Sequence, residues 1–148
     1  MNKNQEQAAN FRDGHEQLLV KIKEAQRKSG CVSKKFISDT AQSLGLSISE
    51  VYGVTTFYSF LSVQPLGKNV IRICKSVPCY MKNAQMIIEA VQDELGISPG
   101  ETTADGRFSF ELTNCIGACD KAPAMLVNDD VHGDLTPGRI VEVLRSYK

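Results

Sequence analysis

Cys74-Lys-Ser-Val-Pro-Cys79 is the stretch around which the chain is organised, and Cys115-Ile-Gly-Ala-Cys119 supplies a second close pair of cysteines. Closely spaced cysteines can direct both sulfurs into one concavity, and two such pairs supply four thiolates for either a zinc site or a binuclear iron–sulfur cluster. The alternatives are two buried thiol pairs or two disulfides, which the Pro, Gly and Asn residues around the pairs disfavour. The spacing therefore predicts a metal centre without choosing the metal.

Composition narrows the class of protein. The chain has 148 residues with 17 basic and 17 acidic side chains, so it offers no basic surface for nucleic acid. Its first residues lack the apolar core of a signal peptide, and its apolar runs are too short for membrane insertion. A fifth cysteine, Cys31, makes the count odd, which favours a reducing compartment. We therefore expect a cytoplasmic protein.

Three short amphipathic helices are expected in the N-terminal part. The first covers about residues 12–28, and the second begins at a Ser33 cap and ends before Gly45. Ser47 and Glu50 form a capping box for the third. The apolar positions of the three helices are Leu18, Leu19, Ile22, Ala25, Phe36, Ile37, Ala41, Leu44, Val51, Val54, Thr55, Tyr58 and Leu61. Short connections predict that these helices pack as a small bundle.

The third helix carries more aromatic surface than one stripe can bury, in Tyr52, Phe57, Tyr58 and Phe60. These rings either pack within the protein or meet a partner subunit, because aromatic residues are enriched at interfaces. Cys31 has no companion cysteine and is interpreted as a structural or incidental thiol. His15 falls on a polar helix face, where we expect it to be solvated.

A change of hydrophobic period marks the domain boundary, within the Pro- and Gly-containing stretch 62–68. Residues 69–74 then alternate as a strand, and Asn83 is a candidate cap for a helix that Gly96 ends. The helix turns Ile87, Ile88, Val91 and Leu95 inward. The first cysteine pair is therefore expected in a loop from strand to helix.

The remaining chain predicts two more strands and a closing helix. After an Asp105-Gly106 turn, residues 108–113 alternate, with Ser109, Glu111 and Thr113 opposite the apolar side chains. The second cysteine pair forms a tight loop before a strand at 124–127. Thr136 caps the last helix, with Pro137 in its first turn and Ile140, Val141, Leu144 and Tyr147 on one face. The fold class is α+β.

The short sequence motifs around the cysteines resemble those of one protein family. They are Ile71-Arg-Ile-Cys74, Val77-Pro-Cys79-Tyr-Met-Lys, Glu94-Leu-Gly-Ile-Ser-Pro-Gly-Glu-Thr-Thr-Ala-Asp-Gly106, Asn114-Cys-Ile-Gly-Ala-Cys119, Ala122-Pro-Ala-Met125 and Asp134-Leu-Thr-Pro137, preceded by Glu50-Val-Tyr-Gly-Val-Thr-Thr-Phe-Tyr58. Together they resemble the thioredoxin-like 2Fe-2S ferredoxin family, and within it the small iron–sulfur subunits of NADH dehydrogenases and related NAD(P)-linked hydrogenases and formate dehydrogenases. The resemblance runs from about residue 12 to the C-terminus.

The resemblance implies an organisation and a cofactor. Residues 1–65 would form a three-helix docking segment, and residues 66–148 a thioredoxin-like ferredoxin domain with one 2Fe-2S cluster. Cys74 and Cys79 would bind one iron, and Cys115 and Cys119 the other. Lys75, Lys82 and Lys121 lie near these ligands in sequence and either favour the reduced cluster or are simply solvated, while Gly117 and Ala118 allow backbone N–H groups to approach sulfur.

The implied function is single-electron transfer inside a hetero-oligomer. The partner would be a flavin- and NAD(P)H-binding subunit, with FMN and further iron–sulfur clusters outside this chain. The chain has no G-x-G-x-x-G or P-loop, so it would be a subunit of an oxidoreductase and not catalytic on its own. The rival interpretations are a structural zinc-binding assembly domain and a thiol-disulfide enzyme. The last is disfavoured because neither pair has two intervening residues.

Overall fold

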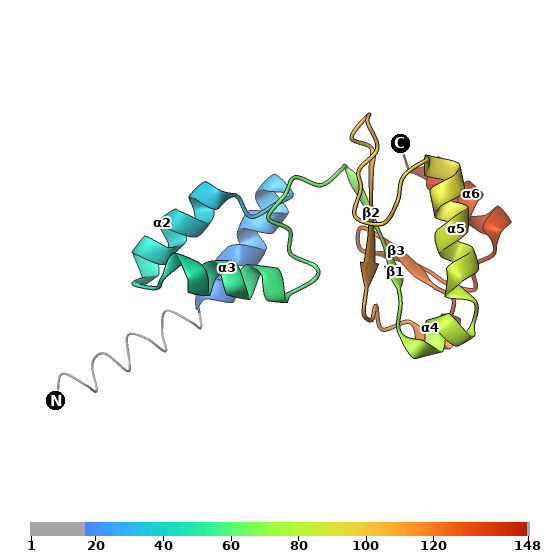
Figure 1. Cartoon of the computed structure of the whole chain (residues 1–148), viewed down its shortest axis with the longest axis horizontal. Helices are drawn as coiled ribbons and strands as arrows, with labels where there is room; N and C mark the ends of the chain where they lie inside the picture. Colours follow the sequence, from blue (N-terminus) through green and yellow to red (C-terminus); the bar gives the residue numbers. More distant parts are fainter. Residues whose placement is uncertain (1–16, 148) are drawn as a thin grey trace. The chain divides into compact units, whose positions relative to one another are not determined.

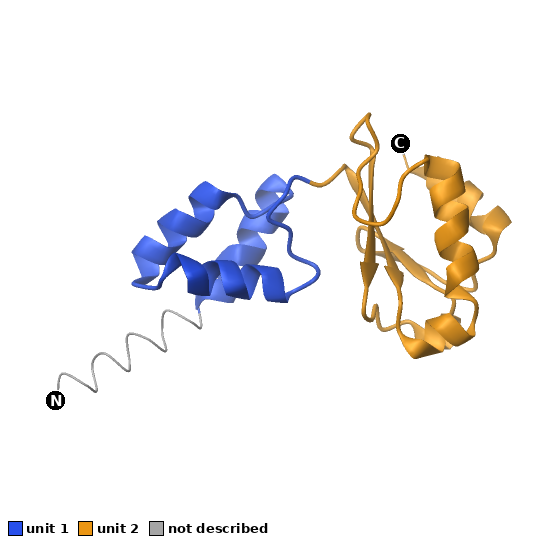
Figure 2. Ribbon diagram, in the orientation of Figure 1, with its two compact units in different colours: residues 1–65 blue, residues 66–148 orange. Residues whose placement is uncertain are grey.

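The computed structural model describes residues 17–147. The chain separates into two compact units, Met1–Pro65 and Leu66–Lys148 (Figure 2). Each unit has a cluster of buried apolar side chains of its own. In the described part of the chain, no helix combines the length and the hydrophobicity needed to cross a membrane.

Three helices build the N-terminal unit: residues 17–29, α2 (Lys34–Leu44) and α3 (Ile48–Phe57). Their apolar faces meet in one buried cluster, formed by Leu18, Ile22, Val32, Ile37, Ala41 and Val51. The predicted three-helix bundle is therefore confirmed. The first five residues of the predicted helix 12–28, and His15 among them, lie outside the described residues.

The starts of α2 and α3 follow from their caps. Ser33 Oγ accepts a hydrogen bond from the Phe36 N–H at 3.2 Å. At α3, the Ser47 N–H donates to Glu50 Oε2 at 2.8 Å, and the Glu50 N–H donates back to Ser47 Oγ at 3.2 Å. Gly45 ends α2 in the left-handed conformation, with φ 65°. Side-chain caps satisfy backbone donors that the first turn of a helix cannot pair.

The third helix ends earlier than the sequence predicts. Tyr58 is already extended, with φ −91° and ψ 112°, so Tyr58 and Leu61 lie beyond the helix. The last turn contains Thr55, Thr56 and Phe57, and β-branched and aromatic residues lose side-chain freedom in a helix. The Phe57 side chain is 80% exposed, and its ring meets Tyr58 edge-on with 5.1 Å between centroids.

A four-stranded sheet forms the C-terminal unit, in the order β2-β1-β3-β4. The strands are β1 (Asn69–Cys74), β2 (Phe108–Thr113), β3 (Met125–Val127) and β4 (Asp130–His132). β1 and β2 are parallel, whereas β3 is antiparallel to β1 and β4. Two helices, α5 (Ala84–Leu95) and α6 (Pro137–Ser146), lie side by side on one side of the sheet (Figure 1).

The core of this unit lies between the sheet and these two helices. Its buried members are Ile71, Ile73, Ile87, Val91, Phe108, Phe110, Met125, Val127, Leu135, Ile140 and Leu144. Alternation along β1 sends Ile71 and Ile73 into this core and places Arg72 and Cys74 on the opposite face. The predicted α+β class is confirmed.

The parallel pairing of β1 with β2 determines the position of the cysteines relative to the sheet. The register places Cys74 opposite Thr113, so both strands end at the same edge of the sheet. The residues that follow parallel strands emerge side by side at that edge. Cys74 therefore lies next to the segment that begins at Asn114 and carries the second pair.

Two short elements and one helix cap of this unit differ from the prediction. A short helix, α4 (Val77–Met81), stands where a loop was expected, and the three-residue strand β4 was not foreseen. Asn83 precedes α5, but its backbone is left-handed, with φ 63°, and its side chain makes no capping hydrogen bond. Asn tolerates this conformation, so it serves as the junction between α4 and α5 instead of as a side-chain cap.

Ser109 lies inside the unit, although alternation predicted an outward position. Its side chain is buried, and its Oγ accepts a hydrogen bond from the Gly67 N–H at 2.7 Å. Thr102 Oγ1 lies 2.6 Å from the same oxygen. The hairpin segment before β2 covers this face of the strand, so a polar side chain is buried there with its hydrogen bonds made.

The end of α6 is tied to β4 by a tyrosine. Thr136 caps the start of α6 by accepting a hydrogen bond from the Arg139 N–H at 3.4 Å, as predicted. At the other end, the Tyr147 hydroxyl donates to Asp130 Oδ2 at 2.9 Å and lies 2.9 Å from His132 Nε2. Burial, followed by the bond to the Asp130 carboxylate and its charge, raises the pKa of Tyr147 to about 12.

Candidate metal centre

The first cysteine pair is buried at the end of β1. Cys74 is the last residue of the strand and Cys79 lies on α4, and each is 1% exposed. Both pack against Ala84 at the start of α5. Pro78 lies in the first turn of α4, where its fixed φ favours a helix start. This explains why a helix replaces the expected loop around Cys79.

The second pair lies in the segment that follows β2. Cys115 and Cys119 are both exposed, and Cys119 begins a short 3-10 helix, η1 (Cys119–Lys121). Gly117 between them has φ 77°, a backbone conformation that favours glycine. Its N–H donates to Cys115 Sγ at 3.4 Å, so the predicted approach of backbone N–H to sulfur is present at Gly117.

The two pairs lie in neighbouring segments. Within each pair the thiols are close enough to shift each other's ionisation, Cys74 with Cys79 and Cys115 with Cys119. Between the pairs, Cys74 Sγ donates to the Asn114 carbonyl at 3.4 Å. The charge of Cys74 also acts on the Cys119 thiol, and the charge of Cys119 acts on the Cys79 thiol. The structure thus places the two predicted pairs in neighbouring segments at one edge of the sheet.

Ionisation of the thiols is uneven. Burial opposes the charge of Cys74, but hydrogen bonds from the Ser76 backbone and the Cys79 thiol outweigh it and lower the pKa of Cys74. Burial, the bond to Cys74 and the Cys74 charge raise the pKa of Cys79 to about 11. Desolvation and the charge of Cys115 raise the pKa of Cys119. Four thiolates are therefore stable together only around a positive centre. Metal binding supplies this centre and releases the thiol protons.

The donor set fits an iron–sulfur cluster. The four side chains are thiols, and two thiolates at each iron is the demand of a binuclear cluster. Within residues 17–147, no three or more His, Cys, Asp or Glu side chains are grouped so that they could hold a single metal ion. The arrangement in pairs, with a backbone N–H on one sulfur, is suited to a cluster that spreads over two pairs.

The remaining predicted candidates are three lysines and the fifth cysteine. Lys75, Lys82 and Lys121 are exposed, as expected for solvated side chains. Cys31 is a free, half-buried thiol in the helical unit. The peptide bond between Ala122 and Pro123 is cis, which the sequence did not indicate.

Sequence reasoning overlooked a buried ion pair on the sheet face that carries Cys74. Arg72 Nε lies 3.0 Å from Glu111 Oε2, and the Arg72 side chain is 8% exposed. The signal was present, because a charged residue interrupts the apolar strand Val-Ile-Arg-Ile and an acidic one occupies the matching place in the next strand.

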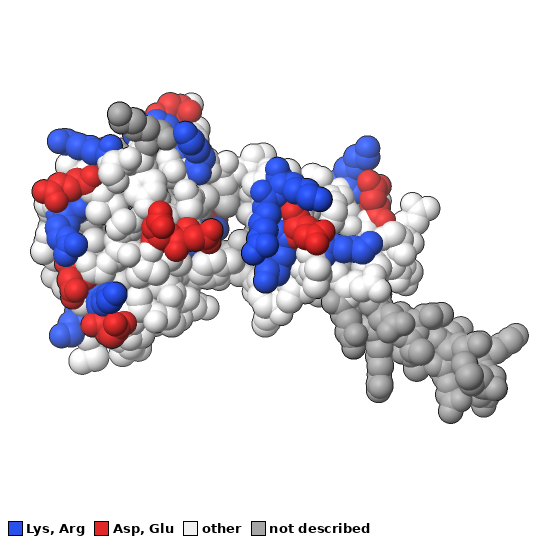
Figure 3. Space-filling view, turned by 180° about the vertical axis from the view of Figure 1, so that it is seen from behind, with Lys and Arg blue, Asp and Glu red and all other residues white. Residues whose placement is uncertain are grey.

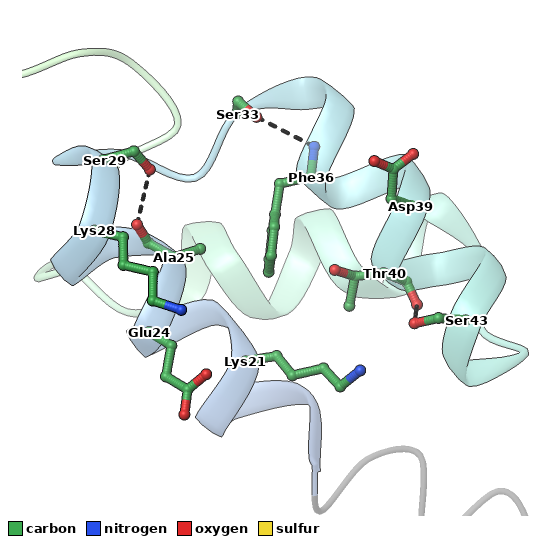
Figure 4. Close-up of a pocket in the computed structure, with 10 residues that line it drawn as sticks. All are labelled: Lys21, Glu24, Ala25, Lys28, Ser29, Ser33, Phe36, Asp39, Thr40 and Ser43. Carbon is green, nitrogen blue, oxygen red and sulfur yellow. Dashed lines mark hydrogen bonds between the residues drawn. The ribbon is translucent and has the colours of Figure 1, made fainter.

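A cavity of about 500 Å³ occurs in the helical unit. It lies between the helix at 17–29 and α2, with Lys21 and Lys28 on one wall and Asp39 on the other (Figure 4). The Phe36 side chain lies between these walls, and among residues 17–147 no cysteine or histidine lines the cavity. The thiol pairs therefore remain the candidate centre.

Comparisons with known proteins agree with this chemistry. A family model described as thioredoxin-like [2Fe-2S] ferredoxin matches residues 4–148. The E subunit of the NADH-quinone oxidoreductase of Pseudomonas aeruginosa is 39% identical over 137 residues, which cover 93% of this chain and 82% of that protein. Its counterpart in Escherichia coli strain K12 is 42% identical over 138 residues, covering 93% and 83%.

A hydrogenase subunit and a solved structure extend the comparison. NADP-reducing hydrogenase subunit HndA of Solidesulfovibrio fructosivorans is 33% identical over 136 residues, which cover 92% of this chain and 78% of that protein. A crystal structure of an air-oxidised NAD+-reducing [NiFe]-hydrogenase matches with a TM-score of 0.72 at 22% identity, covering 88% of this chain and 23% of that one. At this identity the structural match supports the fold alone.

The predicted resemblance is confirmed, and so is the cofactor that the family implies, one 2Fe-2S cluster. The zinc alternative loses its support, because the matched family is one of iron–sulfur proteins. By a model that covers almost the whole sequence and by relatives matched along most of their length, the chain belongs to the thioredoxin-like [2Fe-2S] ferredoxin family.

Proposed function

We propose that the chain is the iron–sulfur electron-transfer subunit of a multisubunit NAD(P)H-linked oxidoreductase, an NADH dehydrogenase or a related hydrogenase. Cys74, Cys79, Cys115 and Cys119 are the proposed ligands of its cluster. The observation that supports the proposal is the placement of two thiol pairs in neighbouring segments at one edge of the sheet, where Cys74 Sγ contacts the Asn114 carbonyl before Cys115. The names of the relatives supply the class of complex.

The division of labour follows from electron counting. A hydride donor such as NADH releases two electrons together, whereas a 2Fe-2S cluster accepts one. A flavin can divide the pair, and the sequence has no dinucleotide-binding glycine motif. The proposed partner is therefore a subunit that binds NAD(P)H and FMN. Further iron–sulfur clusters would lie on the partner subunits, and the assembly would be a cytoplasmic hetero-oligomer.

Exposed apolar side chains support contact with such a partner next to the thiols. On α4, Tyr80 is 70% exposed and Met81 is 79% exposed, while Cys79 on the same helix is buried. Aromatic residues and methionine are enriched at interfaces. The exposed Phe57 of α3 supports the predicted docking role of the helical unit. On the face shown in Figure 3, basic and acidic side chains occur on both units, so the proposed docking relies on apolar contact more than on charge steering.

The ligand assignment is tested by anaerobic purification and cysteine replacement. We expect two irons and two acid-labile sulfides per chain, with the absorption of a 2Fe-2S centre. Replacing any one of the four proposed ligands by Ala should remove most of the bound iron, because it opens a coordination position. Cys31→Ser is the matched control and should keep the cluster. Stoichiometric zinc, or loss of iron only in Cys31→Ser, would contradict the assignment.

The functional role is tested by the order of reduction. NADH is added anaerobically to the cluster-loaded chain, and the flavin subunit of its own complex is added afterwards. We expect no bleaching of the cluster absorption by NADH alone and rapid bleaching once the flavoprotein is present. Rapid bleaching before that addition would mean that the chain oxidises NADH itself.

A further inference from the structure

In the ion pair between Arg72 and Glu111, the arginine is buried in the sheet and the glutamate is partly exposed. Among residues 17–147, Arg72 is the one buried residue that carries a charge, at 7% exposure. Its Nε lies 3.0 Å from Glu111 Oε2, and the two side chains are 8% and 25% exposed. A charge in such a place is only weakly screened by solvent and salt.

The pair lies close to the proposed cluster ligands along the backbone. Arg72 and Cys74 share one face of β1, two residues apart, which separates their Cα atoms by roughly 7 Å. The parallel register places Glu111 opposite Arg72 and Thr113 opposite Cys74. Glu111 is therefore diagonal to Cys74 across the strands, and Arg72 is nearer to it by backbone position.

Stability is a weak reason for an ion pair here. Removing two charges from water is costly, and apolar replacements of buried ion pairs are often neutral or stabilising. Arg72 is only 7% exposed on its own face of β1, so an apolar residue in its place would be buried as well. A buried charge does, however, act strongly on a second charge nearby.

We propose that Arg72 and Glu111 act as an opposed pair that sets the reduction potential of the cluster. This inference rests on the proposed function, since it requires a cluster on the four cysteines. Reduction adds one electron, supplied by the flavin partner, and so adds one negative charge beside the pair. The Arg72 guanidinium stabilises that charge and the Glu111 carboxylate opposes it. Arg72 has the larger effect, because it is nearer and more deeply buried.

The experiment is a redox titration of the full chain, followed by the EPR signal of the reduced cluster. Arg72→Gln should shift the midpoint potential to more negative values, and Glu111→Gln should shift it to more positive values. The double variant should fall between the two single variants. The Arg72→Gln shift should persist at high salt, because the Arg72 charge is buried and poorly screened, whereas the shift from the 25% exposed Glu111 should shrink more.

Glu94 and Arg145 provide a matched control. Their ion pair joins α5 to α6 with Nε and Oε1 3.5 Å apart, and the Arg145 side chain is 74% exposed. The Glu94 side chain is 30% exposed, similar to that of Glu111, so this carboxylate control differs mainly in position. Glu94→Gln and Arg145→Gln remove the same charges near the far end of α5 from Ala84, and should leave the potential unchanged. Arg72→Lys keeps the positive charge and should retain a potential near that of the unmodified protein.

The outcomes separate this inference from the function on which it rests. Shifts of opposite sign in Arg72→Gln and Glu111→Gln support the pair, whereas equal potentials or shifts of the same sign overturn it. If Arg72→Gln does not fold, Glu111→Gln and Arg72→Lys decide the question. An unmodified chain without a 2Fe-2S signal would instead overturn the proposed ligand set.

Discussion

The absence of a side chain at Gly133 permits a close backbone contact that positions the second cysteine pair. A Cβ atom at this position would collide with Lys121 Cβ and would lie 2.9 Å from the Lys121 carbonyl oxygen. The same carbonyl accepts a hydrogen bond from the Asp134 N–H at 2.8 Å. Lys121 ends the short helix that begins at Cys119, so this close backbone contact supports a proposed ligand.

We expect Gly133→Ala to lower the free energy of unfolding by about 1–3 kcal/mol, because the new methyl group forces the backbone at Lys121 to move. Urea unfolding measures the loss, and iron analysis should show reduced cluster occupancy. Gly138→Ala is the control. A Cβ there meets nothing within 4 Å, and alanine favours a helix by up to about 1 kcal/mol over glycine. Equal stability of the two variants would contradict the role given to Gly133.

At the scale of residues, the sequence predicted the cysteines but not their surroundings. Local spacing is enough to pair Cys74 with Cys79, whereas the placement of the two pairs in neighbouring segments depends on the register of β1 with β2. The Arg72–Glu111 contact is likewise a contact between strands far apart in the chain. Such contacts depend on how the strands are arranged in the sheet. The hydrophobic periodicity of one segment carries no information about that arrangement.

Among the elements, the junction of β4 and α6 depends on Tyr147. Its hydroxyl donates to Asp130 Oδ2, lies beside His132 Nε2, and has a pKa raised to about 12. The Tyr147 carbonyl also accepts a hydrogen bond from Arg107 Nη2 at 2.9 Å. These bonds fasten the end of the last helix to the edge strand.

We expect this tyrosine to make stability fall in alkaline solution. The unfolded tyrosine loses its proton near pH 10 and the folded one near pH 12, so the stabilisation is complete below pH 10 and is lost as the pH rises toward 12. Urea unfolding of the unmodified protein and of Tyr147→Phe, at about pH 9 and about pH 11, tests this. The unmodified protein should lose more stability over that interval. A parallel loss in both proteins would contradict the expectation.

The elements that sequence analysis foresaw are those with long, regular patterns. The strand β1, with its apolar run, and the helix α6, with Thr136 as cap, were predicted with nearly the observed bounds. By contrast, α4 has five residues, too few for the helical period to appear, and β4 (Asp130–His132) is mostly polar, unlike the equally short but apolar β3, which was predicted. The sequence pattern assigns Pro78 to a loop, although proline also favours the first turn of a helix.

For the whole molecule, the two separate cores lead to a prediction about independent folding. The helical unit buries residues between Leu18 and Val51, and the other core draws on residues from Ile71 to Leu144. A fragment of residues 66–148 keeps the sheet, its helices and all four proposed ligands. We expect this fragment to fold and to bind two irons, because a core of this kind supports a domain by itself.

The fragment should nevertheless fail to join its complex with full affinity if the helical unit docks as predicted. Iron analysis and circular dichroism test folding, and co-purification with the flavin subunit tests docking. A fragment that is unfolded, or that loses its iron while the full chain retains it, would show that the helical unit is needed for the cluster site.

The parallel pairing of β1 with β2 also sets an order of events during biosynthesis. The two strands meet only after the chain between them has crossed over through α5, so their contact closes a long loop and is slow compared with local helix formation. A nascent chain that has emerged from the ribosome only as far as Cys79 still lacks both the second cysteine pair and the strand that positions it. Iron delivered at that stage would find only two of the four proposed ligands. Cluster insertion should therefore follow synthesis of the sheet, and the cell's assembly machinery should act on a chain already closed around its crossover.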